Sequence, residues 1–240
     1  MPKLIYPTSD ARRLELLKRS KETAAADAAN GNNYLSEVLT LQINETITGF
    51  DSSYSQYNQK LSVRQKEVRE KNEAITRLGV FVRDFYEVLK RRAYRNNEPA
   101  EVLRFYNLPL SGEIPLMHKD DDYTAAALSI VTGDARAVEA GYPAMLNPTA
   151  TEVNEKLTAA LKEKNDVAPA DRELDTVQKE MELKRAETDE LIREIADTLR
   201  FALRKSSDSN QRRTIRTYGF EYSYLQGETV DEDGSGVEIG

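Results

Sequence analysis

Apolar residues recur along the chain at a spacing that predicts long amphipathic helices. The clearest stripe lies near residues 52–95, where one apolar row repeats every seven residues and a second row follows three residues later. Side chains at this spacing lie on one face of a helix, so we expect a continuous apolar seam. The first row is Leu61, Val68, Ile75, Val82 and Leu89, and the second row contains Leu78 and Phe85. Arg64 and Lys71 interrupt the second row, with stems that can cover apolar neighbours while their charges stay in water.

A similar stripe near residues 171–206 aligns with the first at a shift of 113 residues. The tripeptide Gln-Lys-Glu occupies residues 65–67 and again 178–180, and both stretches close with Arg-x-Tyr. A nearly constant offset of this kind predicts an internal duplication. We therefore expect an all-α fold, a helical bundle of two repeats at residues 1–112 and 113–226 that bury their incomplete apolar faces against each other.

Each repeat is expected to begin with a shorter helix, near residues 8–28 in the first and 122–140 in the second, the latter broken near Gly133. Two further interruptions are expected inside the repeats. A turn is predicted at residues 49–53, and Pro169 is predicted to end a helix within residues 165–171 because proline lacks the backbone donor that a helix needs.

Residues 108–115, with two prolines and a glycine, cannot form a continuous helix. They are the predicted linker between the repeats.

The pattern changes at the carboxy-terminal end. Residues 218–225 alternate aromatic with small or polar residues, which predicts either a short extended strip or aromatic rings that pack back onto the bundle. These rings are also candidates for an interaction surface, through Tyr218, Phe220, Tyr222 and Tyr224. Residues 227–240 contain five acids and no base, which predicts an acidic disordered tail.

The composition excludes several classes of enzyme. The chain has no cysteine and a single histidine, His118. It can therefore form neither a thiolate site nor the two-histidine zinc motif. A glycine-rich phosphate loop, a dinucleotide-binding turn and a nucleophile elbow are also missing from the sequence. We expect a protein that is not an enzyme, with no catalytic residues and no cofactor.

Two acidic segments match parts of metal sites without completing one. His118 lies beside Asp120–Asp122, but neighbouring positions rarely converge on one ion, so these acids are expected to cap a helix near Tyr123. Asp231–Gly236 matches the first half of an EF-hand calcium loop, but Glu238 follows where an apolar residue is usual, and the bidentate glutamate is missing. We therefore assign no metal ligand.

Charge is distributed unevenly along the chain. The 34 bases and 41 acids give a net charge of −7, yet residues 60–96 hold eleven bases and five acids. Within this basic helix Lys90, Arg91, Arg92 and Arg95 are candidates to contact a phosphate backbone or an acidic protein surface.

Together these features favour a non-enzymatic structural or assembly protein that self-associates as a homo-oligomer or docks into a larger particle through its helical surfaces. The alternative is a binding module whose basic helix, residues 60–96, engages nucleic acid or an acidic protein partner. No apolar run is long enough to span a membrane, and the amino terminus has no signal-peptide pattern. We therefore expect no membrane partner and a cytoplasmic location.

Overall fold

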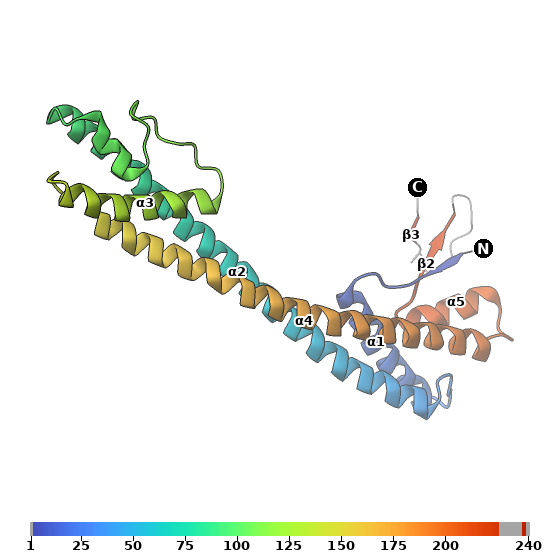
Figure 1. The fold of residues 1–240 in the computed structure, drawn as a ribbon. Helices are drawn as coiled ribbons and strands as arrows, with labels where there is room; N and C mark the ends of the chain where they lie inside the picture. The colour runs from blue at the N-terminus through green and yellow to red at the C-terminus, as the bar shows by residue number, and fades with distance from the viewer. Residues whose placement is uncertain (1, 226–236, 239–240) are drawn as a thin grey trace. The chain divides into compact units, whose positions relative to one another are not determined.

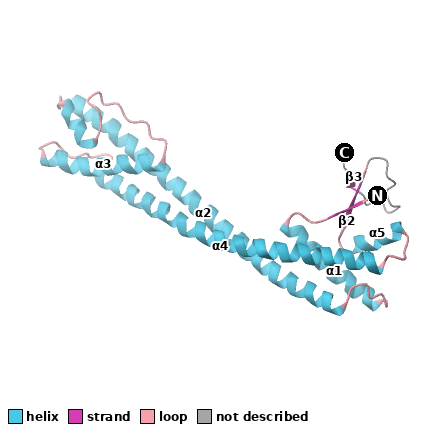
Figure 2. Cartoon of the chain, turned by 45° about the vertical axis from the view of Figure 1, so that its right-hand side comes forward, coloured by secondary structure: helices cyan, strands magenta, loops and turns pink. Residues whose placement is uncertain are grey.

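The computed structural model describes residues 2–225 and 237–238, and it confirms that the chain is mostly helical (Figures 1 and 2). Three short strands accompany the helices. In chain order the elements are β1 (Lys3–Ile5), α1 (Asp10–Ala29), α2 (Glu37–Arg95), the 3-10 helix η1 (Ala100–Tyr106), α3 (Asp120–Glu139), α4 (Ala150–Ala202), α5 (Asp208–Thr217), β2 (Glu221–Tyr224) and β3 (Val237–Glu238). Among the described helices, none has an apolar stretch long enough to cross a membrane.

The chain forms two compact units, and α2 and α4 contribute one part to each. Unit 1 contains Met1–Gln59 and Asp175–Gly240, and unit 2 contains Lys60–Leu174. This is a different division from the predicted repeats, because unit 1 takes one segment from each repeat. The repeat boundaries themselves stay a prediction.

The core of unit 1 lies between α1, the first part of α2, the last part of α4 and the small sheet. Strand β1 pairs antiparallel with β2, with Leu4 opposite Tyr222, and β3 pairs with β2 in parallel. Of the two outcomes expected for residues 218–225, both occur: Glu221–Tyr224 forms an extended strand, and the aromatic side chains of the segment pack into the core. The central side chains of this core include Leu17, Ile43, Ile195, Leu199 and Tyr218, all fully buried.

The core of unit 2 confirms the predicted apolar seam. Ile75, Leu78, Val82, Phe85 and Leu89 are buried between the last part of α2, η1, α3 and the first part of α4. The seam is less complete toward its amino-terminal end, as the sequence indicates, because Leu61 and Val68 are half-buried.

The predicted turn at residues 49–53 is wrong, because α2 continues through it without a break. Phe50 lies in this stretch, is fully buried, and packs with Leu14 and Met181 in a small apolar cluster. Helical geometry places the Phe50 ring in this cluster, so packing outweighs the low helix propensity of the glycine and the two serines nearby.

The predicted interruption at residues 165–171 is also wrong, since α4 runs through Pro169. A proline here removes the hydrogen bond to the carbonyl group of Asn165. Both Pro169 and Asn165 are exposed, so water can bond to that carbonyl, while Ala170 on the buried side stays packed at 7% exposure.

The predicted break in the third helix near Gly133 does not occur either, because α3 is continuous from Asp120 to Glu139. A β-carbon at Gly133 would overlap the backbone carbonyl of Phe105 in η1. The glycine therefore serves the close approach of η1 to α3 and does not end the helix.

Residues 108–115 are non-helical, as predicted. They lie within unit 2 and are packed against it, since Leu108 is 3% exposed and belongs to the core.

Candidate interaction surfaces

The basic character of residues 60–96 is largely neutralised inside unit 2. Lys60 Nζ lies 2.7 Å from Glu173, Arg64 Nε lies 2.9 Å from Asp171, and Lys71 Nζ lies 2.7 Å from Asp120. These acids come from α4 and α3, far away in the sequence. The count of eleven bases and five acids therefore overstates the positive charge that this helix offers to a partner.

The candidate residues Lys90, Arg91, Arg92 and Arg95 do not form one common contact surface. Arg92 donates to Glu98 at 3.2 Å and to the carbonyl group of Pro143, and the Arg92 and Glu98 side chains are 12% and 8% exposed. Arg91 and Lys90 both contact Glu87, through its carbonyl and its carboxylate respectively. Arg92 is thus part of the fold, and Arg95 is exposed.

The aromatic candidates at the carboxy-terminal end are core residues of unit 1. Tyr218, Phe220, Tyr222 and Tyr224 are 0%, 2%, 5% and 2% exposed. The Tyr218 hydroxyl donates to Asp27 Oδ2 at 2.6 Å, and its carbonyl accepts a hydrogen bond from Ser20 Oγ at 2.8 Å. The burial of these four rings explains why aromatic residues alternate with small or polar residues in this segment. We therefore propose no interface through the rings.

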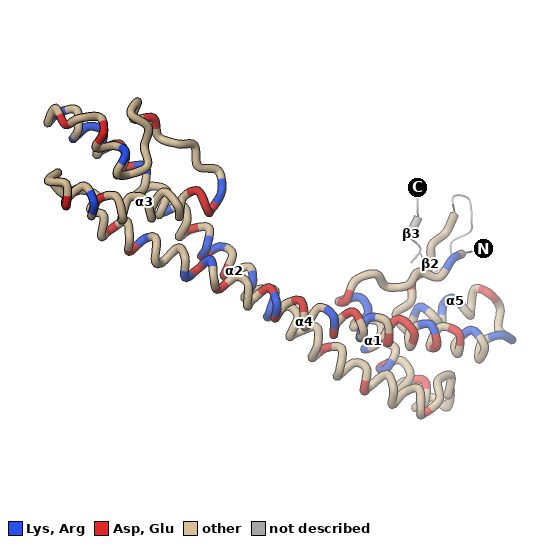
Figure 3. Tube along the Cα trace, viewed as in Figure 1, with Lys and Arg blue, Asp and Glu red and all other residues tan. Residues whose placement is uncertain are grey.

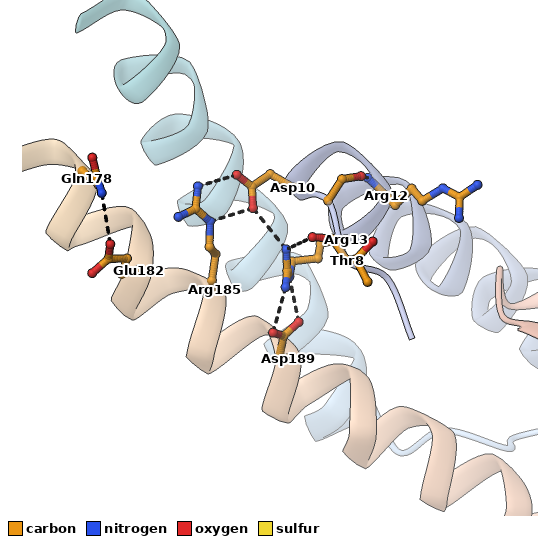
Figure 4. Close-up of polar contacts among 9 residues, drawn as sticks. Thr8, Asp10, Arg12, Arg13, Gln178, Glu182, Arg185 and Asp189 are labelled. Atoms are coloured by element: carbon orange, nitrogen blue, oxygen red, sulfur yellow. Dashed lines mark hydrogen bonds and ion pairs between the residues drawn. The ribbon is translucent and has the colours of Figure 1, made fainter. Parts of the chain in front are cut away.

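A network of four charged residues joins α1 to α4 within unit 1 (Figure 4). Asp10 accepts hydrogen bonds from Arg185 Nε and Nη2 at 2.8 and 2.7 Å, and Arg13 binds Asp189 through Nε and Nη2 at 2.7 and 2.9 Å. Arg13 Nη1 also donates to Asp10 at 3.2 Å. The two bases and two acids balance, so the network acts as a clamp between the helices.

The clamp changes how Asp10 titrates. The hydrogen bonds from Arg185 lower the pKa of Asp10 below its ordinary value of 3.8, with Arg13 adding to the effect against the opposing influence of burial. The ring of Tyr57 also lies beside this network, with its centroid 5.8 Å from the guanidinium carbon of Arg185. No motif in the sequence indicated this network, because its partners lie about 175 residues apart.

The segment after His118 caps a helix, as predicted. Asp122 Oδ2 accepts hydrogen bonds from the backbone amides of Lys119 and His118, each at 2.9 Å, and these bonds lower the pKa of Asp122. Asp120 and Asp121 bind Lys71 and Lys164 respectively. The structure therefore does not gather these acids around His118. The calcium-loop candidate Asp231–Gly236 lies outside the described residues.

The described residues do bring three carboxylates together elsewhere, although the sequence analysis missed them. Oxygens of Glu67, Glu163 and Asp166 lie within 4.8 Å of one another in unit 2. Lys162 lies 3.0 Å from both Glu163 and Asp166, and Lys66 lies 3.6 Å from Glu67. Two ammonium groups thus partly neutralise the three carboxylates, and Lys66 is shared with Glu70. Glu67 belongs to α2 and the other two acids to α4, so only the fold places them together.

A second basic region, which the sequence analysis also missed, lies at the end of α4 and along α5 in unit 1. Residues 199–217 hold six bases against one acid, Asp208, and Figure 3 shows the basic positions at the end of α4 and in α5. Gln211 Nε2 donates to the carbonyl group of Arg200 at 3.2 Å, which brings α5 beside the end of α4. We call this region the α5 basic surface; its bases are Arg200, Arg204, Lys205, Arg212, Arg213 and Arg216. A count of charge along the sequence would have found it.

Two large apolar side chains are exposed near the start of α2 in unit 1. Val38 and Leu41 are 67% and 62% exposed, whereas Leu39 and Ile43 on the other face of the helix are 4% and 0% exposed. Val38 and Leu41 are three residues apart and therefore neighbours on one helix face. The broad apolar face of this helix is thus wider than the core of unit 1 can bury.

Comparison with protein-family models, curated proteins and solved structures finds no match for this chain.

Proposed function

We propose that this chain is a non-enzymatic structural or assembly protein that self-associates through the surface of its helices, alone or within a larger particle. The exposed pair Val38 and Leu41 carries the proposal. Each square ångström of apolar surface removed from water contributes about 25 cal/mol, so burying both side chains in two copies favours association. Neighbouring exposed apolar side chains are a usual feature of protein interfaces.

Self-association suits this surface because a helix face can pair with its own copy. In a twofold dimer the same patch faces itself, so Val38 of one copy can contact Leu41 of the other and the reverse. Side chains that project from one helix can pack into the grooves between side chains of the other. A homo-oligomer is therefore the simplest partner for this face.

The lengths of the helices support the proposed duplication. Helices α1 and α3 each contain 20 residues, and they precede the long helices α2 and α4 of 59 and 53 residues. Each long helix is followed by a short one, η1 or α5. The order short, long, short thus occurs once in residues 1–112 and once in residues 113–226.

The alternative of a binding module that acts through the basic helix at residues 60–96 receives less support. Lys60, Arg64 and Lys71 are paired with acids of unit 2, and Arg92 is held by Glu98. A polyanion would have to compete with these ion pairs. We therefore keep self-association as the proposed function.

The test is the molar mass measured by light scattering over a wide range of protein concentration. We expect a mass above the 27.2 kDa of one chain, and a return to one chain in the double variant Val38→Ser, Leu41→Ser. The control is Leu128→Ser, Val138→Ser, which removes apolar groups that are 56% and 46% exposed in unit 2 and should leave the mass unchanged.

Circular dichroism would confirm that all variants are folded. A wild-type protein that stays monomeric at every concentration would refute self-association. A mass that falls equally in the control would refute the assignment to Val38 and Leu41.

A further inference from the structure

A groove lies where η1 meets α3 in unit 2, and we call it the η1–α3 groove. Its volume is about 390 Å³, and its walls are formed by Glu101, Arg104, Phe105, Asn107 and Arg136. The first four residues belong to η1 and its carboxy-terminal cap, and Arg136 belongs to α3. All five lie within unit 2. Pockets for small ligands usually measure about 300–1,000 Å³, so this groove has room for a small molecule.

Close packing of η1 on α3 fixes the walls of the groove. Gly133 permits this approach, because a β-carbon there would overlap the Phe105 carbonyl oxygen. Arg136 follows Gly133 by three residues and therefore lies on the same side of α3. The Asn107 side chain joins the two elements, since its Nδ2 donates to Ser129 Oγ at 2.9 Å. The groove is thus formed before any ligand arrives, which lowers the entropic cost of binding.

Two guanidinium groups line this groove without a partner. Arg104 and Arg136 are both exposed, and within residues 2–225 and 237–238 neither side chain makes an ion pair or a hydrogen bond. Glu101 is the one acid among the described residues that line the groove, and it makes no ion pair with either arginine. Two positive charges therefore stand against one negative charge, so the groove favours an anion.

An aromatic ring lies among these charges. Phe105 is half-buried and lines the groove, and on another side its ring meets that of Tyr142, with centroids 5.9 Å apart and planes at 62°. This edge contact holds the Phe105 ring in place. A fixed ring offers an apolar surface to a second ring, so the groove presents an aromatic contact as well as two cations.

We propose that the η1–α3 groove binds a small aromatic anion, whose carboxylate or phosphate group lies between Arg104 and Arg136 and whose ring contacts Phe105. Guanidinium groups bind both of these oxyanions with two parallel hydrogen bonds. An inorganic anion has no ring for Phe105, and a neutral aromatic molecule has no charge for the arginines. The site lies in unit 2 and does not depend on Val38 and Leu41, so its test is separate from that of self-association.

The test is an NMR titration of the ¹⁵N-labelled protein at low salt with two probes, benzoate and phenyl phosphate. We expect amide shifts to gather in η1 and around Arg136, and the probe that binds more tightly identifies the oxyanion as carboxylate or phosphate. Benzyl alcohol, which has the ring without the charge, should bind at least about tenfold more weakly than the better probe. Inorganic phosphate, which has the charge without the ring, should bind at least about threefold more weakly than phenyl phosphate.

Three variants test the roles of the charges. Arg136→Gln should weaken binding of the better probe about tenfold or more, because a hydrogen bond between ionised groups is lost. The matched control is Arg69→Gln, which removes an exposed arginine of α2 in the same unit and should change the affinity less than about twofold. Glu101→Gln removes the negative charge from the groove and should tighten binding about twofold. Spectra that are unchanged away from the groove would show that each variant is folded.

The absence of amide shifts with both probes at about 10 mM would overturn the proposal. An equal loss of affinity in Arg136→Gln and Arg69→Gln would overturn it as well, since binding would then follow overall charge. Weaker binding in Glu101→Gln would contradict the assigned anion, because the carboxylate would then be a ligand group. Equal binding of benzyl alcohol would refute the part assigned to the arginines, and equal binding of inorganic phosphate the part assigned to Phe105.

Discussion

Two segments of this chain have a similar excess of basic over acidic residues, but their basic side chains have different neighbours. Residues 60–96 hold eleven bases and five acids, and residues 199–217 hold six bases and one acid. In the first segment, acids from α3 and α4 lie 2.7–2.9 Å from Lys60, Arg64 and Lys71. In the second, Arg200 lies 3.4 Å from Asp197 of its own helix, and the Arg204 guanidinium carbon lies 4.0 Å from the ring centroid of Phe201. The number of bases along a helix therefore does not predict a basic surface; the acids on the neighbouring helices decide it.

The largest effect is expected at Arg92, a candidate interaction residue whose side chain is only 12% exposed. Replacing Arg92 by alanine leaves the Glu98 carboxylate, 8% exposed, without its cation and removes the hydrogen bond to the Pro143 carbonyl. We expect a loss of about 3 kcal/mol in the free energy of unfolding, measured by urea denaturation. Arg95→Ala, on an exposed neighbour, should cost less than about 0.5 kcal/mol. Equal effects of the two substitutions would show that Arg92 is not part of the fold.

A smaller effect is expected in the charge clamp of unit 1, where Arg13 and Arg185 are both paired with carboxylates. Asp10→Asn removes the carboxylate that binds Arg185 and Arg13 and should lower the free energy of unfolding at pH 7 by about 2 kcal/mol. The folded state lowers the pKa of Asp10, so its carboxylate stabilises the protein above the ordinary value of 3.8.

This contribution is lost as the pH falls through the lowered pKa of the folded state. The stability difference between wild type and Asp10→Asn should therefore shrink below pH 3.8. A difference that is constant from pH 7 into this acid range would contradict the role of the ionised carboxylate.

The smallest effect is expected at the surface pair Lys60 and Glu173, whose side chains are 38% and 56% exposed. A double-mutant cycle with alanine at both positions should give a coupling free energy of about 0.5 kcal/mol. The pair thus neutralises charge without contributing much to stability. A coupling above about 1.5 kcal/mol would mean that this pair is far better shielded from water than its exposure indicates.

The sequence predicted the elements that depend on local pattern. Helix α1, the range of α3 but not its continuity at Gly133, and the seam from Ile75 to Leu89 follow from local pattern, and the alternation at residues 218–225 left two outcomes open, of which both are found. The helix-capping role of Asp122 followed in the same way, because a carboxylate beside a helix amino terminus needs no distant partner.

The features that the sequence did not predict depend on distant partners. Phe50 keeps α2 continuous because Leu14 and Met181 pack around it, and Pro169 is tolerated because it lies on the exposed side of α4. The clamp of Asp10 and Arg185 joins residues from opposite ends of the chain. None of these pairings leaves a periodic pattern in the sequence, so helix propensity alone gave the wrong result at residues 49–53, at residues 165–171 and at Gly133.

The measurement that tests the proposed function most directly is the molar mass of the wild-type protein by light scattering, across concentration, at about 50 mM and about 500 mM salt. An interface built on Val38 and Leu41 is apolar, so we predict a mass above 27.2 kDa that rises with concentration and persists at the higher salt. A mass of one chain at all concentrations, or an oligomer that dissociates at the higher salt, would contradict it.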